Sequence, residues 1–354
     1  MQRPRLKTTT ELFDSPDGDI CLLRPSADCD LVLEGAGARG RELVARLDGS
    51  TPRAALEAEF GSDAVGELLD LLGSEGLVED ASAYDALAGA ERERYDRQLR
   101  YFADIAPDGL TAPDCQLRLR SARVVVLGVG GLGSWAALSL ACCGVGELTL
   151  VDGDAVELSN LNRQVLYSED DLGRPKAPVA AAAIERFNPG VRVVPVVRTL
   201  GTPDEIAAAV RGSSFVVDAA DRPAHDIERW VNAACFEHGV PYITMSHFPP
   251  FARVGPMYVP GETGCFNCQE RAYRRSYELY DHLVEQRRGS PSPAATLGPV
   301  CAFVGGQVAL DVVHQLTGLC PPASKGSVRV FDTRTLELSS EPVPRDPFCE
   351  VCGG

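Results

Sequence analysis

A glycine-rich loop follows an apolar run in the middle of the chain, with glycines at positions Gly128, Gly130, Gly131 and Gly133. Without side chains in the way, backbone N–H groups of such a loop can approach a phosphate at the N-terminus of the next helix. A nicotinamide enzyme has the same loop and an acidic residue about 20 positions later, which binds ribose hydroxyls. Asp152 occupies that place. These two features by themselves favour a dehydrogenase.

The side chains that follow favour a triphosphate instead. The stretches DGDAVELSNLNRQ and LGRPKA bring two amides and two cations close to the loop in sequence: Asn160, Arg163, Gln164 and Lys176. The forked guanidinium of arginine and the point charge of lysine can together stabilise an α-phosphate during AMP transfer. We also count Asp154 among the cofactor-binding candidates. The alternative is a solvated charged loop without a ligand.

An acidic residue ends a later predicted strand, SFVVDAAD. A Mg²⁺ ion that bridges phosphates needs hard oxygen ligands at the carboxyl edge of the sheet. Asp221 is our candidate magnesium ligand. Asp218 competes for the role, and we interpret it as structural.

Two C-x-x-C pairs, Cys265/Cys268 and Cys349/Cys352, have the spacing of metal ligands. Four thiolates give tetrahedral coordination of Zn²⁺ and leave no open position for catalysis. We therefore predict a structural zinc site that ties the end of the chain to the segment after the sheet. Redox-active or unpaired cysteines are the alternative.

The elements that must position these residues alternate between strand and helix. Apolar runs predict strands over 123–130, 147–152, 191–197, 214–221 and 241–246, with helices over 134–146, 175–188, 204–212 and 227–239. This order predicts an α/β fold with a mostly parallel, Rossmann-like sheet that binds ligands at its carboxyl edge. Residues 270–297, rich in charge, Tyr, Pro and Ser, are expected to form a long mobile excursion before a last helix over 300–318.

A smaller domain precedes this unit. Residues 1–82 carry strand patterns over 20–26 and 30–35 and helical patterns that end near Gly49, Gly61 and Gly76. We predict a small winged-helix (α+β) domain over 1–82, a linker over 83–94, and an α/β domain over 95–354.

Composition and charge narrow the function classes. The 354 residues carry a formal charge of −16, and no cluster of Lys and Arg stands out, so we expect no nucleic-acid partner. The chain starts without an apolar signal core and has no run of about 18 apolar residues, so we expect no membrane partner and a cytoplasmic location. Thiols stay reduced there, which favours metal ligation over disulfides.

The ordered motifs GVGGLG, DGDAVELSNLNRQ, LGRPKA, VVDAADR, CFNC and CEVC resemble the ThiF and MoeB enzymes, bacterial relatives of the ubiquitin-activating enzymes. The resemblance covers residues 92–354 and implies an ATP-dependent adenylyltransferase that works as a homodimer. It also implies roles for the residues: Asp152 on the ribose, Asn160, Arg163, Gln164 and Lys176 near the phosphates, and Asp221 on magnesium. Arg97 in RYDRQLR matches an arginine that, in this family, reaches the ATP of the neighbouring subunit.

The chain departs from this family at one point. Sulfur-carrier activators often have a cysteine in the crossover segment, but SPSPAATLGPV has none. Cys301 lies within an apolar helical pattern, which favours a small buried residue over a nucleophile. The resemblance therefore supports adenylation and not thioester transfer. We interpret His247 and His282 as lying outside any catalytic constellation.

Residues 8–80 resemble the PqqD-like recognition elements of enzymes that modify ribosomally made peptides, through LLRP, VLEG, LDG, STPRAAL and LLDLLGSEGLV. Such domains capture a leader peptide as an added strand at a sheet edge. A winged helix used for dimerisation is the alternative, and acidic helices disfavour DNA binding.

With both resemblances taken together, the chain is similar to the microcin C adenylating enzymes. We expect ATP and Mg²⁺ to be used to adenylate a carboxyl or amide group of a precursor peptide in natural-product or bacteriocin biosynthesis. Activation of the C-terminal Gly-Gly of a sulfur carrier, for thiamin or molybdopterin, is the alternative reaction. A peptide-binding scaffold that delivers a precursor to another enzyme is an alternative of a different class.

Overall fold

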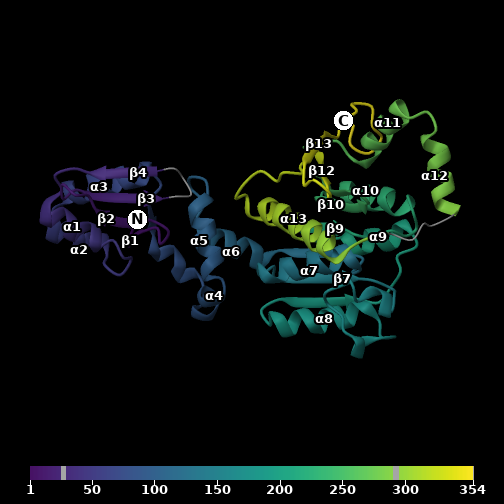
Figure 1. Cartoon of the computed structure of the whole chain (residues 1–354), viewed down its shortest axis with the longest axis horizontal. Coiled ribbons are helices and arrows are strands. Elements are labelled where there is room, and N and C mark those ends of the chain that lie inside the picture. The colour runs from purple at the N-terminus through teal and green to yellow at the C-terminus, as the bar shows by residue number, and fades with distance from the viewer. Residues whose placement is uncertain (25–28, 290–294, 354) are drawn as a thin grey trace. The chain divides into compact units, whose positions relative to one another are not determined.

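The computed structural model describes residues 1–353 except 25–28 and 290–294, and it divides into two compact units, 1–117 and 118–354 (Figure 1). Each unit has its own sheet and its own buried core.

The first unit contains a three-stranded antiparallel sheet of β2 (Glu11–Asp14), β3 (Ile20–Arg24) and β4 (Cys29–Leu33). A short pair, β1 (Pro4–Leu6) with β5 (Val78–Asp80), joins the two ends of the region. Helices α1 (Gly37–Ala45), α2 (Arg53–Phe60) and α3 (Ser62–Ser74) pack their apolar sides on a core that includes Leu22, Leu43, Leu56, Leu69 and Leu72. The strands and helices predicted here are confirmed, and β2 is an additional edge strand.

Residues 81–121 are largely helical. The short 3₁₀ helix η2 (Ala81–Ala86) is followed by α4 (Gly89–Arg94), α5 (Asp96–Ile105) and α6 (Ala112–Ser121). The segment 83–94, expected to be a linker, therefore carries regular structure. Its alanines and charges favour a helix as readily as a polar connection.

The second unit is built on an eight-stranded sheet of order β13-β12-β11-β10-β9-β6-β7-β8. Five neighbouring strands are parallel, as the sequence predicts: β6 (Arg123–Leu127), β7 (Glu147–Val151), β8 (Arg192–Val196), β9 (Phe215–Asp218) and β10 (Tyr242–Phe248). Three further strands extend the sheet in antiparallel fashion: β11 (Phe251–Tyr258), β12 (Ser327–Asp332) and β13 (Leu338–Pro342). The unit is thus α/β with a mostly parallel central sheet.

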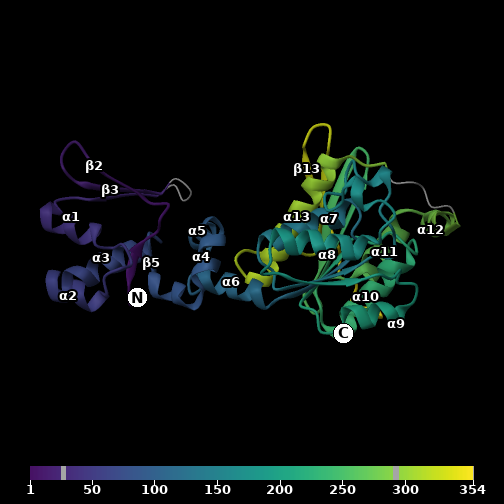
Figure 2. The same cartoon turned by 90° about the horizontal axis from the view of Figure 1, so that it is seen from below.

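Helices cover both faces of this sheet (Figure 2). α7 (Gly131–Cys142), α8 (Lys176–Phe187) and α13 (Gly298–Thr317) lie on one face, and α9 (Pro203–Val210) and α10 (Asp226–His238) lie on the other. Among the described residues only α13 is long and apolar enough to cross a membrane. Half of its apolar window is buried, and it packs against α7, so we interpret it as the core helix of this unit.

The larger part of the segment 270–297, expected to be a long mobile excursion, is helical. Two helices, α11 (Phe266–Ser276) and α12 (Tyr280–Gly289), occupy it. α11 buries Cys268, Gln269 and Glu270 and exposes arginines, so its composition is polar although its backbone is helical. Residues 290–294 of the predicted excursion lie outside the described residues.

Candidate active site

The glycine loop lies where the chain crosses from one face of the sheet to the other. β6 lies between β7 and β9 in the sheet. The helix that leads into β7, α7, and the helix that leads into β9, α9, lie on opposite faces (Figure 2). Such a switch point opens a crevice at the carboxyl ends of the strands, where α/β proteins bind nucleotides. α7 begins at Gly131, so the N–H groups at its start point into that crevice.

Two of the four glycines are required by close backbone packing. Gly128 has φ +83°, and a Cβ atom there would lie 2.8 Å from the carbonyl oxygen of Ala219, which follows β9. A Cβ atom on Gly133 would lie 1.9 Å from the carbonyl oxygen of Gly128. Any larger residue would push the loop away from α7 or from the β9 loop. The motif therefore reflects a turn that brings two loops together.

Asp152, one residue after β7, is hydrogen-bonded to the backbone of the glycine loop. Its Oδ2 accepts a hydrogen bond of 2.8 Å from the N–H of Val129, and its Oδ1 accepts one of 2.8 Å from the N–H of Asp154. Burial raises the pKa of Asp152, and the two backbone hydrogen bonds and the charge of Lys176 act in the opposite direction. Each carboxylate oxygen keeps a lone pair that can accept a ribose hydroxyl.

Tyr167 also binds the backbone of the glycine loop, and sequence analysis did not single it out. Its hydroxyl donates a hydrogen bond of 2.8 Å to the carbonyl of Val129, so both polar backbone groups of Val129 are bonded to side chains. Burial raises the pKa of Tyr167, which keeps the hydroxyl protonated as a donor. A tyrosine after an apolar leucine carries no motif, so only the structure could reveal this contact.

The amide and cationic candidates sit on a short helical turn beside the glycines. In η3 (Leu158–Asn160) the buried Asn160 side chain accepts a hydrogen bond of 3.1 Å from the N–H of Glu157. Arg163 donates to the carbonyl of Ser159 at 2.6 Å, and its Cδ lies 3.4 Å from where a Cβ of Gly131 would be. The indole of Trp135 donates to the Arg163 carbonyl at 3.1 Å and so fixes this turn to α7.

Gln164 is the one candidate in this group with an unmet hydrogen-bonding need. It is only 4% exposed, its Nε2 lies 3.8 Å from the Cβ position of Gly130, and its buried Oε1 has no partner among the described residues. An acceptor left unpaired in a protein interior costs free energy, about 1–3 kcal/mol. A bound ligand or water at the glycine loop would satisfy it.

Lys176 is held close to the loop by an acidic partner. The residue opens α8, its side chain is 8% exposed, and its Nζ lies 3.0 Å from Oδ2 of Asp154, which is 72% exposed. The ammonium group is therefore inside the crevice wall and its partner is at the surface. A phosphate oxygen in the crevice could replace or share that carboxylate.

The two aspartates that follow the β9 strand differ in environment. Asp218 is fully buried, and desolvation together with the nearby Glu228 carboxylate raises its pKa to about 8. A carboxyl group that stays protonated is a poor ligand for Mg²⁺, which supports the structural interpretation. Asp221 is exposed and lies two residues after Ala219, whose carbonyl oxygen leaves no room for a Cβ atom at Gly128. Its position suits a cation ligand.

Arg97 belongs to the other unit. It lies on α5, its side chain is 89% exposed, and its guanidinium lies 3.8 Å from Asp96. The residues that the structure brings together at the carboxyl edge are therefore the glycine loop, Asp152, Asp154, Asn160, Arg163, Gln164 and Lys176, with Asp221 on the adjoining loop.

Four cysteines form a separate cluster at the start of α11. The sulfur atoms of Cys265, Cys268, Cys349 and Cys352 all lie within 4.8 Å of one another, with Cys265 to Cys349 at 3.5 Å and Cys268 to Cys352 at 3.3 Å. Tetrahedral ligands at the usual Zn–S distance of about 2.3 Å would be roughly 3.8 Å apart. The four thiols thus form a candidate metal site that fits the predicted ion.

Of the remaining titratable candidates, His282 lies away from the glycine loop, whereas the sulfur of Cys301 lies 3.0 Å from where a Cβ of Gly131 would be. His282 is exposed on α12, whereas His247, near the end of β10, has its Nδ1 3.3 Å from Oγ1 of Thr296. That hydroxyl lies 3.2 Å from the sulfur of Cys301. Cys301 is 1% exposed and burial raises the pKa of its thiol, so the expected small buried residue is confirmed.

The fold and the crevice define a nucleotide-binding α/β enzyme. Residues 95–351 match the ThiF family, and the chain belongs to that family. It is 35% identical over 261 residues to the sulfur carrier protein ThiS adenylyltransferase of Escherichia coli, covering 74% of this chain and 95% of that protein. It is 34% identical over 256 residues to the molybdopterin-synthase adenylyltransferase of the same organism, covering 72% and 96%. The chain is an adenylyltransferase.

Two solved structures are similar over nearly the whole length. PaaA matches with a TM-score of 0.76 and 28% identity over 95% of this chain and 99% of that one. Escherichia coli MccB with MccA-N7isoASN matches with a TM-score of 0.76 and 25% identity over 100% of both chains. These matches include the first unit, which the two curated relatives reported above leave largely uncovered.

Proposed function

We propose that this adenylyltransferase uses ATP to adenylate a carboxyl or amide group of a ribosomally made precursor peptide and releases pyrophosphate. The observation that carries the proposal is the full-length similarity to PaaA and MccB, since the sulfur-carrier enzymes match only about three quarters of the chain. MccB has been solved with N-formylated MccA and is described as a microcin C7 biosynthetic enzyme. We extend that kind of biosynthetic role, with a peptide as substrate, to this chain.

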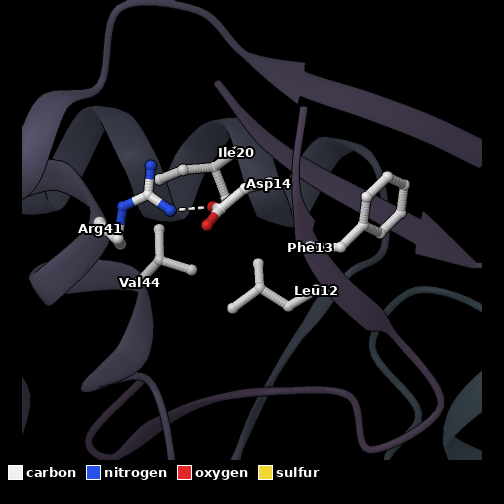
Figure 3. A pocket seen from close by; sticks show the side chains of 6 residues that line it. All are labelled: Leu12, Phe13, Asp14, Ile20, Arg41 and Val44. Atoms are coloured by element: carbon white, nitrogen blue, oxygen red, sulfur yellow. Dashed lines mark hydrogen bonds and ion pairs between the residues drawn. The ribbon is translucent and has the colours of Figure 1, made fainter. Parts of the chain in front are cut away.

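The first unit offers the features that strand addition requires. β2 is an edge strand, and all four of its residues are exposed. Next to it is a cavity of about 240 Å³, lined by Leu12, Phe13, Asp14, Ile20, Arg41 and Val44. In Figure 3, Leu12 and Val44 face each other across this cavity, Arg41 pairs with Asp14, and Phe13 points away. The free backbone of β2 supports capture of an extended leader peptide, as a PqqD-like recognition element would do.

The crevice residues suit AMP transfer. The N–H groups at the start of α7 would bind phosphate oxygens, and Asp152 would accept the ribose hydroxyls. Lys176 would turn from Asp154 to the phosphates, and Arg163 would stabilise the charge that moves when a substrate oxygen attacks the α-phosphorus. Asn160 and Gln164 would complete the polar wall. Mg²⁺, held by Asp221, would neutralise the leaving pyrophosphate.

Zinc at the four cysteines would be structural. All four ligand positions are taken by protein, so no coordination site is left for a substrate. The ion would join the start of α11 to residues 349–352 near the end of the chain.

A homodimer would complete the active site. Arg97 is almost fully exposed, and within the described part of the chain its ion pair is the long one with the neighbouring Asp96, which leaves its guanidinium available to a second copy of the chain. We propose that it contacts the ATP bound by the other subunit.

Activation of a sulfur carrier is the second candidate, favoured by the 35% identity to the ThiS adenylyltransferase. Against it, the segment from 269 to 300 contains no cysteine for a thiol step. A peptide-binding scaffold with a vestigial nucleotide site is the third. The intact set of Arg163, Lys176 and Asp221 argues against it.

Binding of the precursor encoded beside this gene tests the peptide proposal. We expect Leu12→Asp to weaken binding of the labelled peptide at least about tenfold, because it places a charge in the cavity next to β2. Val32→Asp is the matched control, since Val32 is as exposed (47% against 46%) but lies on β4, the opposite edge of the same sheet. Equal binding of wild type and Leu12→Asp, measured by fluorescence anisotropy, would contradict capture at β2.

A further inference from the structure

The end of α12 brings an arginine to the carboxyl edge of the sheet. Arg288 forms an ion pair of 2.5 Å with Asp226, the first residue of α10, so the last turn of α12 lies at the N-terminus of α10. The preceding residue, Arg287, lies over the ring of Phe248, with its guanidinium carbon 5.9 Å from the ring centroid. Burial and, after it, the charge of Arg287 lower the pKa of His225. Arg287 is therefore close to both the β10 end and the start of α10.

Arg287 differs from the other arginines of α11 and α12. Each of the others has a carboxylate partner within the described part of the chain: Arg271 and Arg275 pair with Asp346, Arg274 with Glu270, and Arg288 with Asp226. Arg287 has no such partner among the described residues and is exposed, as is Phe248 at 62%. A guanidinium stacked on an exposed ring and lacking a counter-ion is oriented to receive an anion.

This arginine borders the nucleotide crevice. β10 runs parallel to β9 with Thr244 opposite Asp218, so Phe248 stands beyond the carboxyl edge, on the same side as Asp221. His225 connects the Asp221 loop to α10 in a left-handed conformation, with φ 67°, and its buried Nδ1 has no partner among the described residues. Non-glycine residues rarely adopt this conformation, and they gather at functional sites.

We propose that Arg287 and Phe248 form a subsite for a carboxylate of the substrate, placed next to the group that is adenylated. The inference rests on the proposed function and adds a substrate class: a peptide that carries a negative charge close to its reacting group. Arg287 binds that carboxylate through charge-assisted hydrogen bonds, and the ring of Phe248 holds the guanidinium plane in position. The carboxylate is either an Asp or Glu side chain or the free C-terminus.

The test uses the precursor peptide encoded beside this gene in three synthetic forms: unmodified, with its Asp and Glu residues replaced by Asn and Gln, and with an amidated C-terminus. We expect Arg287→Gln to raise KM for the unmodified peptide about tenfold, with KM for ATP unchanged and Arg287→Lys less affected. One of the two modified peptides should show the same increase with wild-type enzyme and no further increase with Arg287→Gln. Which one does so identifies the source of the carboxylate.

Arg211→Gln is the matched control. Arg211 is also exposed, but it is the C-cap residue of α9 and precedes the amino end of β9, at the opposite edge of the sheet. An unchanged peptide KM in Arg287→Gln, or a rise in KM for ATP instead, would overturn the subsite while leaving adenylation intact. Failure of the wild-type enzyme to form AMP with the unmodified precursor would contradict the proposed function itself.

Discussion

Lys176 and Asp154 form an ion pair whose two ends differ in environment. The ammonium is almost buried and the carboxylate is mostly exposed, so the lysine is fixed in place while its partner can be exchanged. A buried ammonium needs a compensating charge at all times. Asp154 supplies that charge in the structure, and a phosphate oxygen can supply it when nucleotide is bound. The ammonium group of Lys176 is thus already positioned for a phosphate before nucleotide binds.

Replacement of the charged crevice residues should remove catalysis and leave the fold intact. We expect Lys176→Ala, Arg163→Ala and Asp221→Ala each to lower kcat for AMP formation by roughly 10²–10³, because each is proposed to stabilise charge that moves in the transition state. Arg186→Ala, on the exposed side of α8, is the control. Pyrophosphate release is the measurement, and near-normal rates in all three variants would exclude this crevice as the site of chemistry.

The raised pKa of Asp218 gives a pH dependence with a definite sign. Between its ordinary pKa of 3.8 and the folded-state value of about 8, Asp218 is protonated in the folded chain and ionised in the unfolded chain. Unfolding then releases a proton, so the free energy of unfolding falls as pH rises, by up to about 1.4 kcal/mol per pH unit. Urea denaturation at pH 5.5, 6.5 and 7.5 should show a shallower decline for Asp218→Asn than for wild type. Parallel declines would show that Asp218 is ionised in the folded state.

At the scale of elements, sequence reasoning works where periodicity and burial agree. The strands β6, β7, β9 and β10 and the helices between them were predicted because valine-rich runs alternate with amphipathic segments. Gly128 and Gly133 were predicted as a phosphate loop, and the structure adds the reason that a Cβ atom at either position would strike backbone. The hydrogen bonds that join Asp152 and Tyr167 to Val129 depend on tertiary geometry, so no sequence pattern predicts them.

Sequence reasoning fails where a helix has the polar composition that is typical of a loop. α11 and α12 are rich in arginine and tyrosine, so they resemble a loop, yet α11 is stabilised by ion pairs such as Arg229 with Glu270 and by the cysteine cluster at its start. The strands β11 to β13 were missed because they pair in antiparallel fashion beyond the alternating pattern. The stability of a strand depends on its cross-strand neighbours and its burial as well as on its own residues.

Metal content tests the cysteine cluster. Purified protein should contain about one zinc per chain, and Cys349→Ser should lower both the zinc content and the melting temperature, because the end of the chain loses its attachment to α11. Cys142→Ser, an exposed free cysteine on α7, is the control. Elemental analysis that finds no metal in soluble, active wild-type protein would contradict the site.

At the scale of the whole molecule, the proposed reaction needs parts that one unit does not contain. The crevice lies in residues 118–354, whereas the peptide edge β2 and the exposed Arg97 lie in residues 1–117. Both would have to act on one substrate. The proposed homodimer would supply a second set of these groups to each crevice.

Mixed dimers test whether Arg97 acts across subunits. Arg97→Ala and Lys176→Ala homodimers should each be nearly inactive, but a heterodimer of the two should recover up to about half of wild-type activity, because one of its two crevices receives both residues intact. Co-purification with two affinity tags isolates the heterodimer. Activity that stays at background in the heterodimer would place the action of Arg97 within its own chain or outside catalysis.

Pyrophosphate release with paired substrates tests most directly whether this enzyme adenylates a peptide. Wild-type enzyme is given ATP and Mg²⁺ with either the precursor encoded beside the gene or a ubiquitin-like carrier that ends in Gly-Gly. We predict release with the precursor, reduced by Leu12→Asp and not by Val32→Asp, and little release with the carrier. Strong release with the carrier and none with the precursor, unaffected by Leu12→Asp, would contradict the peptide substrate and leave a sulfur-carrier adenylyltransferase.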